Sequence, residues 1–152
     1  MIDQRAAVVL EALSFEGTAY HHMGRLKIKR GADGAVLDRG GVDCAQLPFL
    51  VYYNAGLIPF IPLEYYPEEW FVHRSEERFL ATIEAYAHQV EEPKPGDLAI
   101  WKFGRCFSHS AIVIDPAWPA IIHSVRSAGC VLRDSGLGGH HADKPRRFYS
   151  LW

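Results

Sequence analysis

The chain has 152 residues, of which 49% are hydrophobic and 22% are charged, and its formal net charge at pH 7 is -2. These values predict one globular domain over residues 1–152, and they exclude the strongly basic surface that binding to nucleic acid or to an anionic membrane requires. No apolar run approaches the roughly 20 residues that cross a bilayer, so we expect no insertion into a membrane.

The N-terminus and the cysteines indicate where the chain is made. An acid at Asp3, and a second at Glu11 that interrupts the following apolar stretch, do not fit a secretory signal. The chain has 3 cysteines, Cys44, Cys106 and Cys130. This small, odd number argues against a disulfide framework. We therefore expect a chain that is cytoplasmic when synthesised, in a reducing compartment.

The first third of the chain predicts two helices with a long loop between them. Residues 4–15 are rich in good helix formers, and Gly17 follows as a stop signal. Residues 16–42 combine glycines with scattered charges, which is typical of a loop, and loops of this length are often functional. Asp43 is a good N-cap and predicts a second helix over about 44–55 with an apolar stripe on one face.

An irregular connection and a third helix precede a run of strands. Residues 57–74 contain several prolines and aromatics, and Ser75 then caps a helix over about 76–90. Beyond it the pattern changes to short apolar runs that predict strands over 98–103, 108–114, 120–125, 130–132 and 147–151. Helices first and strands second predict an α+β fold, in which N-terminal helices pack on a C-terminal antiparallel sheet.

Cys44 is the candidate nucleophile. It follows Asp43 at the head of the second predicted helix, and Gln46 occupies the third position of a capping box. Peptide dipoles at a helix N-terminus favour negative charge, so we expect the pKa of this thiol to be lowered. A thiolate is a good nucleophile and a neutral thiol a poor one, which predicts nucleophilic catalysis. The plainer interpretation is that Cys44 is a small buried core residue.

Two histidines on neighbouring predicted strands are candidates for the base and its partner. If Ile114 pairs with Ala120 across the short connection, His109 and His123 lie on one face as diagonal neighbours. His109 would then take the thiol proton, and His123 would fix the tautomer of His109. A shift of one residue in the register would put the two imidazoles on opposite faces.

A metal site is an alternative use of the same histidines. Cys106 and His109 have the spacing C-x-x-H, and His123 and Cys130 follow, which together make a possible zinc site. That site would leave Cys44 without a role. We therefore favour catalysis without a metal or any other cofactor.

The order and spacing of these motifs resemble the NlpC/P60 family of cysteine peptidases, over nearly the whole chain from about residue 5 onward. The segments that carry the resemblance are Gly17-Thr18-Ala19-Tyr20, Gly41-Val42-Asp43-Cys44, Pro95-Gly96-Asp97-Leu98, His109 in its apolar strand, Ile121-Ile122-His123 and the Arg146-Arg147-Phe148-Tyr149 end. The resemblance implies a compact papain-like α+β domain. It also implies cleavage of peptide bonds in bacterial cell-wall stem peptides, commonly next to D-glutamate and diaminopimelate.

The resemblance gives each candidate residue a role by its position. Cys44 resembles the nucleophile, His109 the catalytic base and His123 the third, orienting residue. Tyr20 resembles the family tyrosine that lines the site near the oxyanion, where the Cys44 backbone N–H is the other expected donor. Asp43 lies directly beside the nucleophile, so we expect it with Tyr20 on the substrate and oxyanion side of the site.

Two departures from the family pattern lie beside the reacting residues. The family usually has Asp-Cys-Ser-Gly where this chain has Asp43-Cys44-Ala45-Gln46, and His-Val-Gly where it has His109-Ser110-Ala111. Since the reacting side chains are all present, these changes bear on substrate choice more than on chemistry. The alternative is a noncatalytic phage-tail or wall-binding module that kept the fold and lost turnover.

The resemblance also implies partners. The substrate would be a peptide of peptidoglycan. Single-domain chains of this size are similar to peptidases of phage tails and gene-transfer agents, so a phage-like particle with its assembly proteins would carry the chain to the cell wall.

Overall fold

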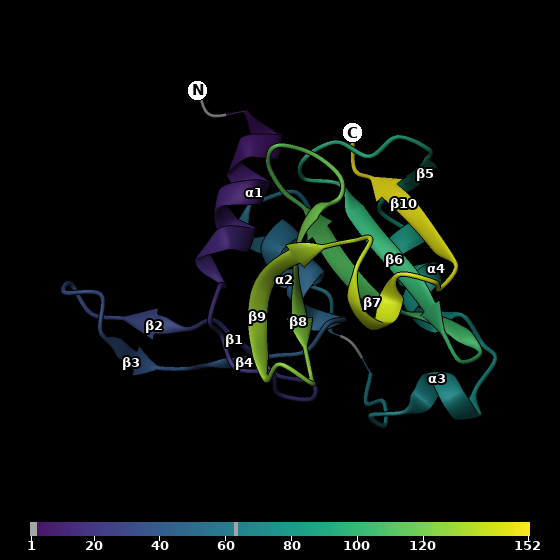
Figure 1. Cartoon of the computed structure of the whole chain (residues 1–152), viewed down its shortest axis with the longest axis horizontal. Helices are drawn as coiled ribbons and strands as arrows, with labels where there is room; N and C mark the ends of the chain where they lie inside the picture. Colours follow the sequence, from purple (N-terminus) through teal and green to yellow (C-terminus); the bar gives the residue numbers. More distant parts are fainter. Residues whose placement is uncertain (1–2, 63) are drawn as a thin grey trace.

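The computed structural model describes residues 3–62 and 64–152 and has the expected α+β fold (Figure 1). Its main sheet is antiparallel throughout, with the strand order β5-β10-β6-β7-β8-β9. The strands are β5 (His88–Val90), β6 (Leu98–Phe103), β7 (Cys106–Val113), β8 (Ala120–Val125), β9 (Cys130–Ser135) and β10 (Arg146–Ser150). The helices are α1 (Gln4–Ser14), α2 (Gln46–Asn54), α3 (Trp70–His73), α4 (Arg78–Glu84) and the 3-10 helix η1 (Gly139–His141).

The first two helices follow their sequence signals closely. Gly17 comes after α1 with a φ of 88°, a left-handed conformation that favours glycine. Helix α2 begins two residues later than predicted, because Cys44 and Ala45 form a turn instead. The Asp43 carboxylate accepts hydrogen bonds from the backbone N–H groups of Ala45 and Gln46, at 3.1 and 2.8 Å. Cys44 therefore lies just before the helix, on the turn that Asp43 caps.

The predicted bounds of the third helix, about 76–90, are wrong. Glu77 and not Ser75 flanks its start, and α4 ends at Glu84. The last residues of the predicted helix, His88–Val90, form β5 at the edge of the main sheet and pair with β10. The apolar spacing continues past Glu84, but pairing with β10 satisfies the backbone there in place of another helical turn.

The segments predicted as loops contain short elements. Residues 16–42 hold two small antiparallel sheets, formed by β1 (Arg25–Leu26) with β4 (Gly41–Val42) and by β2 (Lys29–Arg30) with β3 (Val36–Asp38). The β2–β3 hairpin projects away from the rest of the fold (Figure 1). The 57–74 connection ends in α3. Strand β4 leads directly into the Cys44 turn, so the β1–β4 sheet anchors one side of that turn.

The predicted strands are all present in the main sheet. Two match their predicted bounds, β6 and β8, whereas β7 begins earlier, at Cys106, and β9 continues to Ser135. The last strand lies one residue earlier than predicted. Over residues 3–62 and 64–152, none of the helices combines the length and the apolar composition needed to cross a membrane.

The main sheet is covered on both faces. The helices pack on one face, where Val8, Leu47 and Ile112 belong to the large hydrophobic core. A smaller apolar cluster on the other face consists of Ala99, Trp101, Ala111 and Ile121. Successive strand residues point to opposite faces, so His109 and His123 lie on the side of the smaller cluster, with the rings of His109 and Trp101 5.7 Å apart.

Candidate active site

The two predicted histidines meet between β7 and β8. The N–H of Ile114 donates to the Ala120 carbonyl at 2.9 Å, and the strands continue in the same register, so the register assumed from the sequence is confirmed. His109 Nε2 lies 2.8 Å from His123 Nδ1, within hydrogen-bond distance. This contact leaves Nδ1 of His109 as the ring nitrogen available to a thiol.

A bulge in β7 provides the contact point for Cys44. The pairing of β7 with β6 shifts register next to His109 and skips Ser108. The freed Ser108 carbonyl accepts a hydrogen bond from the Cys44 thiol at 3.4 Å. Bulges of this kind take backbone groups out of the ladder and re-aim the side chains beside them. The bulge thus brings the candidate nucleophile to the residue that precedes the candidate base.

Two serines hold the Cys44 turn against both strands. Ser110 Oγ of β7 donates to the Cys44 carbonyl at 2.6 Å, and Ser124 Oγ of β8 donates to the Val42 carbonyl at 2.7 Å. Both serines are buried. Since Ser110 directly follows His109, the turn is bound on both sides of the predicted base.

Asp43 is the structural centre of this turn and not a substrate contact. Its side chain is buried, and its Oδ1 caps α2. Its Oδ2 accepts hydrogen bonds from the Met23 N–H at 2.8 Å and from the Tyr66 hydroxyl. Because these partners occupy both oxygens, the prediction that Asp43 faces the substrate is wrong. It instead ties the loop before β1 and the 57–74 connection to the turn that carries Cys44.

Burial shifts the pKa of the Cys44 thiol and that of the His109 imidazole toward their neutral forms. Burial, and after it the Asp43 carboxylate, raise the pKa of the Cys44 thiol against the lowering effect of nearby backbone N–H groups. Burial, and then the imidazoles of His123 and His141, hold the pKa of His109 well below its usual range. The expected lowering of the thiol pKa is therefore wrong: Cys44 precedes the helix, and burial outweighs the dipole.

Tyr20 lies within electrostatic range of the candidate nucleophile. It is partly buried and forms a parallel bridge with Val42, just before the Cys44 turn. Burial, and after it Cys44 and Asp43, raise the pKa of the Tyr20 hydroxyl. A phenol with a raised pKa stays a neutral hydrogen-bond donor, which is what the predicted oxyanion role requires. Its contact with a substrate stays a prediction.

Asp134 is a site residue that the sequence analysis missed. Its Oδ2 lies 2.9 Å from His123 Nε2. In the β8–β9 ladder Leu132 pairs with His123 and Asp134 pairs with Ile121, so Asp134 is a diagonal neighbour of His123 on the same face. The register argument that joined the two histidines would also have found Asp134, but the predicted strand ended at Leu132, where the sequence becomes polar.

The alternative zinc site is not formed. The Cys106 thiol donates to the carbonyls of Arg74 and Glu76, at 3.1 and 3.5 Å. The nitrogens of the candidate ligands His109 and His123 face each other and Asp134. Within residues 3–62 and 64–152, no group of three or more histidine, cysteine or acidic side chains has the arrangement of a metal site.

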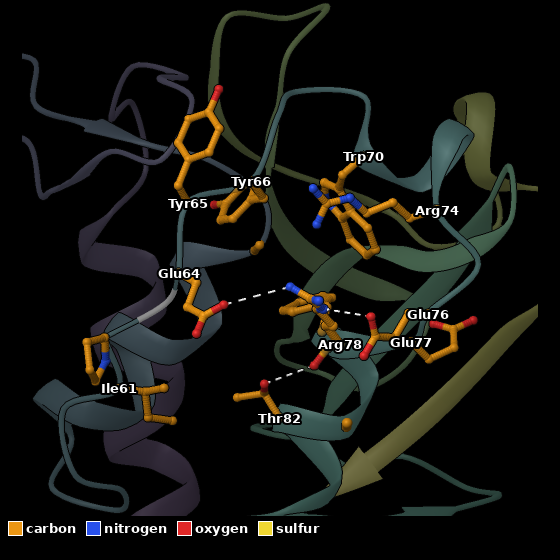
Figure 2. Close-up of a pocket in the computed structure, with 14 residues that line it drawn as sticks. Ile61, Glu64, Tyr65, Tyr66, Trp70, Arg74, Glu76, Glu77, Arg78 and Thr82 are labelled. Atoms are coloured by element: carbon orange, nitrogen blue, oxygen red, sulfur yellow. Dashed lines mark hydrogen bonds and ion pairs between the residues drawn. The ribbon is translucent and has the colours of Figure 1, made fainter.

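A pocket of about 460 Å³ opens next to Ala45, the residue after the candidate nucleophile (Figure 2). Its walls come from residues 61, 62 and 64–66, from Trp70 and from the first turns of α4. Figure 2 shows Glu64 facing Arg78 across the pocket, where the two exposed side chains form an ion pair at 3.7 Å. The volume suits a small ligand or part of a peptide. The sequence analysis missed this pocket because its residues are spread over an irregular connection and two short helices.

Solved structures share this fold across nearly the whole chain. The NlpC/p60 domain of the peptidoglycan hydrolase SagA is 20% identical, with a TM-score of 0.56 over 96% of this chain and 97% of that one. The peptidoglycan hydrolase RipB from Mycobacterium tuberculosis is 18% identical, with a TM-score of 0.60 over 97% of this chain and 64% of that one. The P60 domain of antigen MAP1204 from M. avium subspecies paratuberculosis is 15% identical, with a TM-score of 0.59 over 97% and 94%. The chain has the NlpC/P60 fold.

The chain is similar to these solved structures in its fold. Its sequence matches no protein-family model and no curated protein. Within this NlpC/P60 fold, the residues that depart from the family pattern have structural roles. Gln46 is buried and its amide donates to the Tyr66 hydroxyl at 3.3 Å, and Ser110 binds the Cys44 carbonyl. Ala45, another of these departures, lines the pocket.

Proposed function

We propose that the chain is a cysteine peptidase that cleaves stem peptides of bacterial peptidoglycan, with Cys44 as nucleophile, His109 as base and His123 as orienting residue. The observation that carries the proposal is the 2.8 Å contact between His109 Nε2 and His123 Nδ1, beside the Cys44 turn. It supports a base whose second ring nitrogen serves a thiol. Two of the solved structures with this fold belong to peptidoglycan hydrolases, which supports the substrate class.

Catalysis begins from a neutral thiol and a neutral imidazole. The Cys44 thiol turns from the Ser108 carbonyl to Nδ1 of His109, and its proton passes to that nitrogen as sulfur attacks the amide carbon. A C–S bond forms and the π electron pair of the carbonyl moves to its oxygen. Collapse of this adduct breaks the C–N bond, and His109 returns the proton to the leaving amine. Water, deprotonated by the same imidazole, then hydrolyses the thioester.

The developing oxyanion needs donors close to Cys44. The Cys44 backbone N–H and the Tyr20 hydroxyl are the donors that we propose for it. The raised pKa of Tyr20 supports this role, because the phenol keeps its proton through the reaction.

The pocket beside Ala45 is the proposed place for the peptide on one side of the scissile bond. It combines the indole of Trp70 with charged groups that include Arg74 and Glu77. Stem peptides likewise combine carboxylates with apolar side chains, so a lining of this mixed kind fits them. The departure at Ala45 would then change how a substrate enters the pocket without changing the reacting groups.

The test is digestion of purified peptidoglycan, with the released fragments identified by mass. We expect the wild-type protein to cut peptide bonds, and Cys44→Ala to lose this activity with little change in thermal stability, because the residue is small and only partly buried. Cys130→Ala removes another partly buried thiol, on β9, and is the matched control, which should stay active. Full activity in Cys44→Ala, or fragments cut in the glycan strands instead, contradicts the proposal.

A noncatalytic wall-binding module is the second candidate. The observation that favours it is the resting thiol, which donates to the Ser108 carbonyl and has a raised pKa. Such a module would sediment with purified peptidoglycan and release no fragments. Delivery to the wall by a phage-like particle, and a single domain over residues 1–152, stay predictions.

A further inference from the structure

Asp134 continues the line of hydrogen bonds that begins at His109. Its Oδ2 lies 2.9 Å from His123 Nε2, and His123 Nδ1 lies 2.8 Å from His109 Nε2. We propose that Asp134 is a positioning residue whose carboxylate sets the tautomers of both imidazoles, so that Nδ1 of His109 is the unprotonated nitrogen. This role rests on the proposed function, in which that nitrogen accepts the proton of Cys44.

The tautomers follow from the donors and acceptors along the line. Burial opposes ionisation of Asp134, but hydrogen bonds from Ser135 and His123 outweigh it and lower the pKa, so the side chain is a carboxylate that can only accept. Burial lowers the pKa of His123 against the opposing effect of Asp134, so that ring is neutral. His123 must then carry its proton on Nε2 and accept at Nδ1. His109 must donate from Nε2, which leaves a lone pair on its Nδ1.

The strand that carries Asp134 also holds its carboxylate in place. Asp134 pairs with Ile121 in the β8–β9 ladder, and its Oδ1 accepts the Ser135 N–H at 2.8 Å. The side chain is 38% exposed whereas that of His123 is 2% exposed, so the contact brings a surface charge to a buried ring. Each carboxylate oxygen therefore has a separate protein donor, and the orientation of the group is fixed.

The other titratable groups around the line have different partners. His141 is buried with its ring 5.4 Å from that of His123, but its Nε2 lies 3.0 Å from the Ser135 carbonyl. Arg133, the residue before Asp134, donates to the Glu16 carboxylate at 2.8 and 3.0 Å on the surface. In the part of the chain that the structure describes, Asp134 is the acid bonded to His123.

An amide in place of the carboxylate reverses the direction of the hydrogen bonds from residue 134 to His109. In Asp134→Asn the Ser135 N–H keeps the remaining oxygen, so the NH2 group faces His123 Nε2 and that nitrogen must accept. His123 then donates from Nδ1, and His109 accepts at Nε2 and carries its proton on Nδ1. A substitution of this kind next to a catalytic imidazole lowers kcat by about 10⁴-fold. Asp134 is one imidazole further from the nucleophile, so we expect Asp134→Asn to lower kcat/KM by about 10²-fold or more.

Nitrogen-15 NMR of the histidine rings tests this directly, because it reports which ring nitrogen carries a proton in the resting protein. We expect Nε2–H on both His109 and His123 in the wild-type protein, and Nδ1–H on both in Asp134→Asn. Glu16→Gln is the matched control: it releases Arg133, the neighbour of Asp134, and should keep both the tautomers and the activity.

The outcomes separate this role from a structural one and from the proposed function. An Nδ1–H signal on His109 of the wild-type protein, or wild-type tautomers and activity in a folded Asp134→Asn, overturns the role. If Asp134→Asn does not fold, Asp134→Ala replaces it, and unchanged tautomer populations in that variant likewise overturn the role. A wild-type protein with the expected tautomers that cleaves no peptidoglycan contradicts the proposed function and leaves the role of Asp134 standing.

Discussion

Cys44 and Cys106 have similar local surroundings but different positions relative to the histidines. Each thiol donates to a backbone carbonyl, Cys44 to Ser108 at 3.4 Å and Cys106 to Arg74 at 3.1 Å. Burial raises the pKa of both thiols, and in each case a nearby carboxylate raises it further. Cys44, however, is partly exposed and bound to β7 beside His109, whereas Cys106 is fully buried at the start of β7.

The hydrogen bond and the raised pKa of a thiol therefore do not single out a nucleophile in this molecule. What differs is that Cys44 is partly exposed and is hydrogen-bonded to Ser108 and Ser110, the two residues that flank His109. The position of His109, the proposed base, depends on the sheet, since adjacent strands carry His109, His123 and Asp134 as successive diagonal neighbours. The account can therefore be broken by changes on the side of the histidines as well as at the cysteine.

The largest effect should come from removing His109, the proposed base for Cys44. We expect His109→Ala to lower kcat/KM for a stem-peptide substrate by about 10³-fold, because His109 is the group that we propose to take the thiol proton. His140→Ala removes an exposed histidine of η1 and should change the rate by less than about twofold. Quantifying fragments by mass measures both rates. A His109→Ala variant with near wild-type turnover contradicts the account.

Alkylation compares the two thiols directly. In the folded protein, iodoacetamide should label Cys44 at least about tenfold faster than the fully buried Cys106. Since the Cys44 pKa is raised, its labelling rate should climb steadily between about pH 6 and pH 9. Peptide mapping after timed quenching gives both rates. A rapid rate that does not change with pH would instead indicate a preformed thiolate–imidazolium pair.

Mild acid should destabilise the fold through the imidazole of His109. Because the pKa of His109 is held below the value of about 6.5 in the unfolded chain, the unfolded state binds protons first as the pH falls. This contribution to stability is complete above about pH 6.5 and is lost below it, by up to about 1.4 kcal/mol per pH unit. Urea unfolding near pH 7 and pH 5.5 measures the loss, which should shrink in His109→Gln. The same pH dependence in both proteins would be inconsistent with a lowered pKa at His109.

The smallest effect should come from the pocket, whose lining includes neither Cys44 nor Cys106. Trp70→Ala removes the indole from its wall, and we expect KM to rise about tenfold with little change in kcat. Leu37→Ala is the control, since Leu37 is 64% exposed on the β2–β3 hairpin. Steady-state kinetics on a defined muropeptide separate the two constants. A fall in kcat at constant KM would place Trp70 in the catalytic machinery instead.

The meeting of the two histidines could be predicted because one short connection fixes the register of their strands. Pairing Ile114 with Ala120 leaves a single set of diagonal neighbours, and apolar alternation assigns their common face. The capping role of Asp43 could also be predicted, because its hydrogen bonds are made with the residues that follow it in the chain.

The features that were missed depend on contacts between distant segments. Asp134 belongs to an exposed, polar part of β9, which has no apolar alternation to mark it as a strand. Strand β5 exists because β10 pairs with it, although its own residues continue a helical spacing. The pKa of Cys44 is set by burial and by the direction of the Asp43 carboxylate, neither of which the position before a helix reveals.

Trapping the thioester is the most direct test of Cys44 as the nucleophile. The wild-type protein would be quenched with acid during digestion of peptidoglycan fragments, and its cysteine peptides examined by mass spectrometry. The account predicts an acyl group from the substrate on Cys44, none on Cys106 or Cys130, and none on any cysteine in His109→Ala. Cleaved peptides released with no adduct on Cys44, and at the same rate by Cys44→Ala, would contradict it.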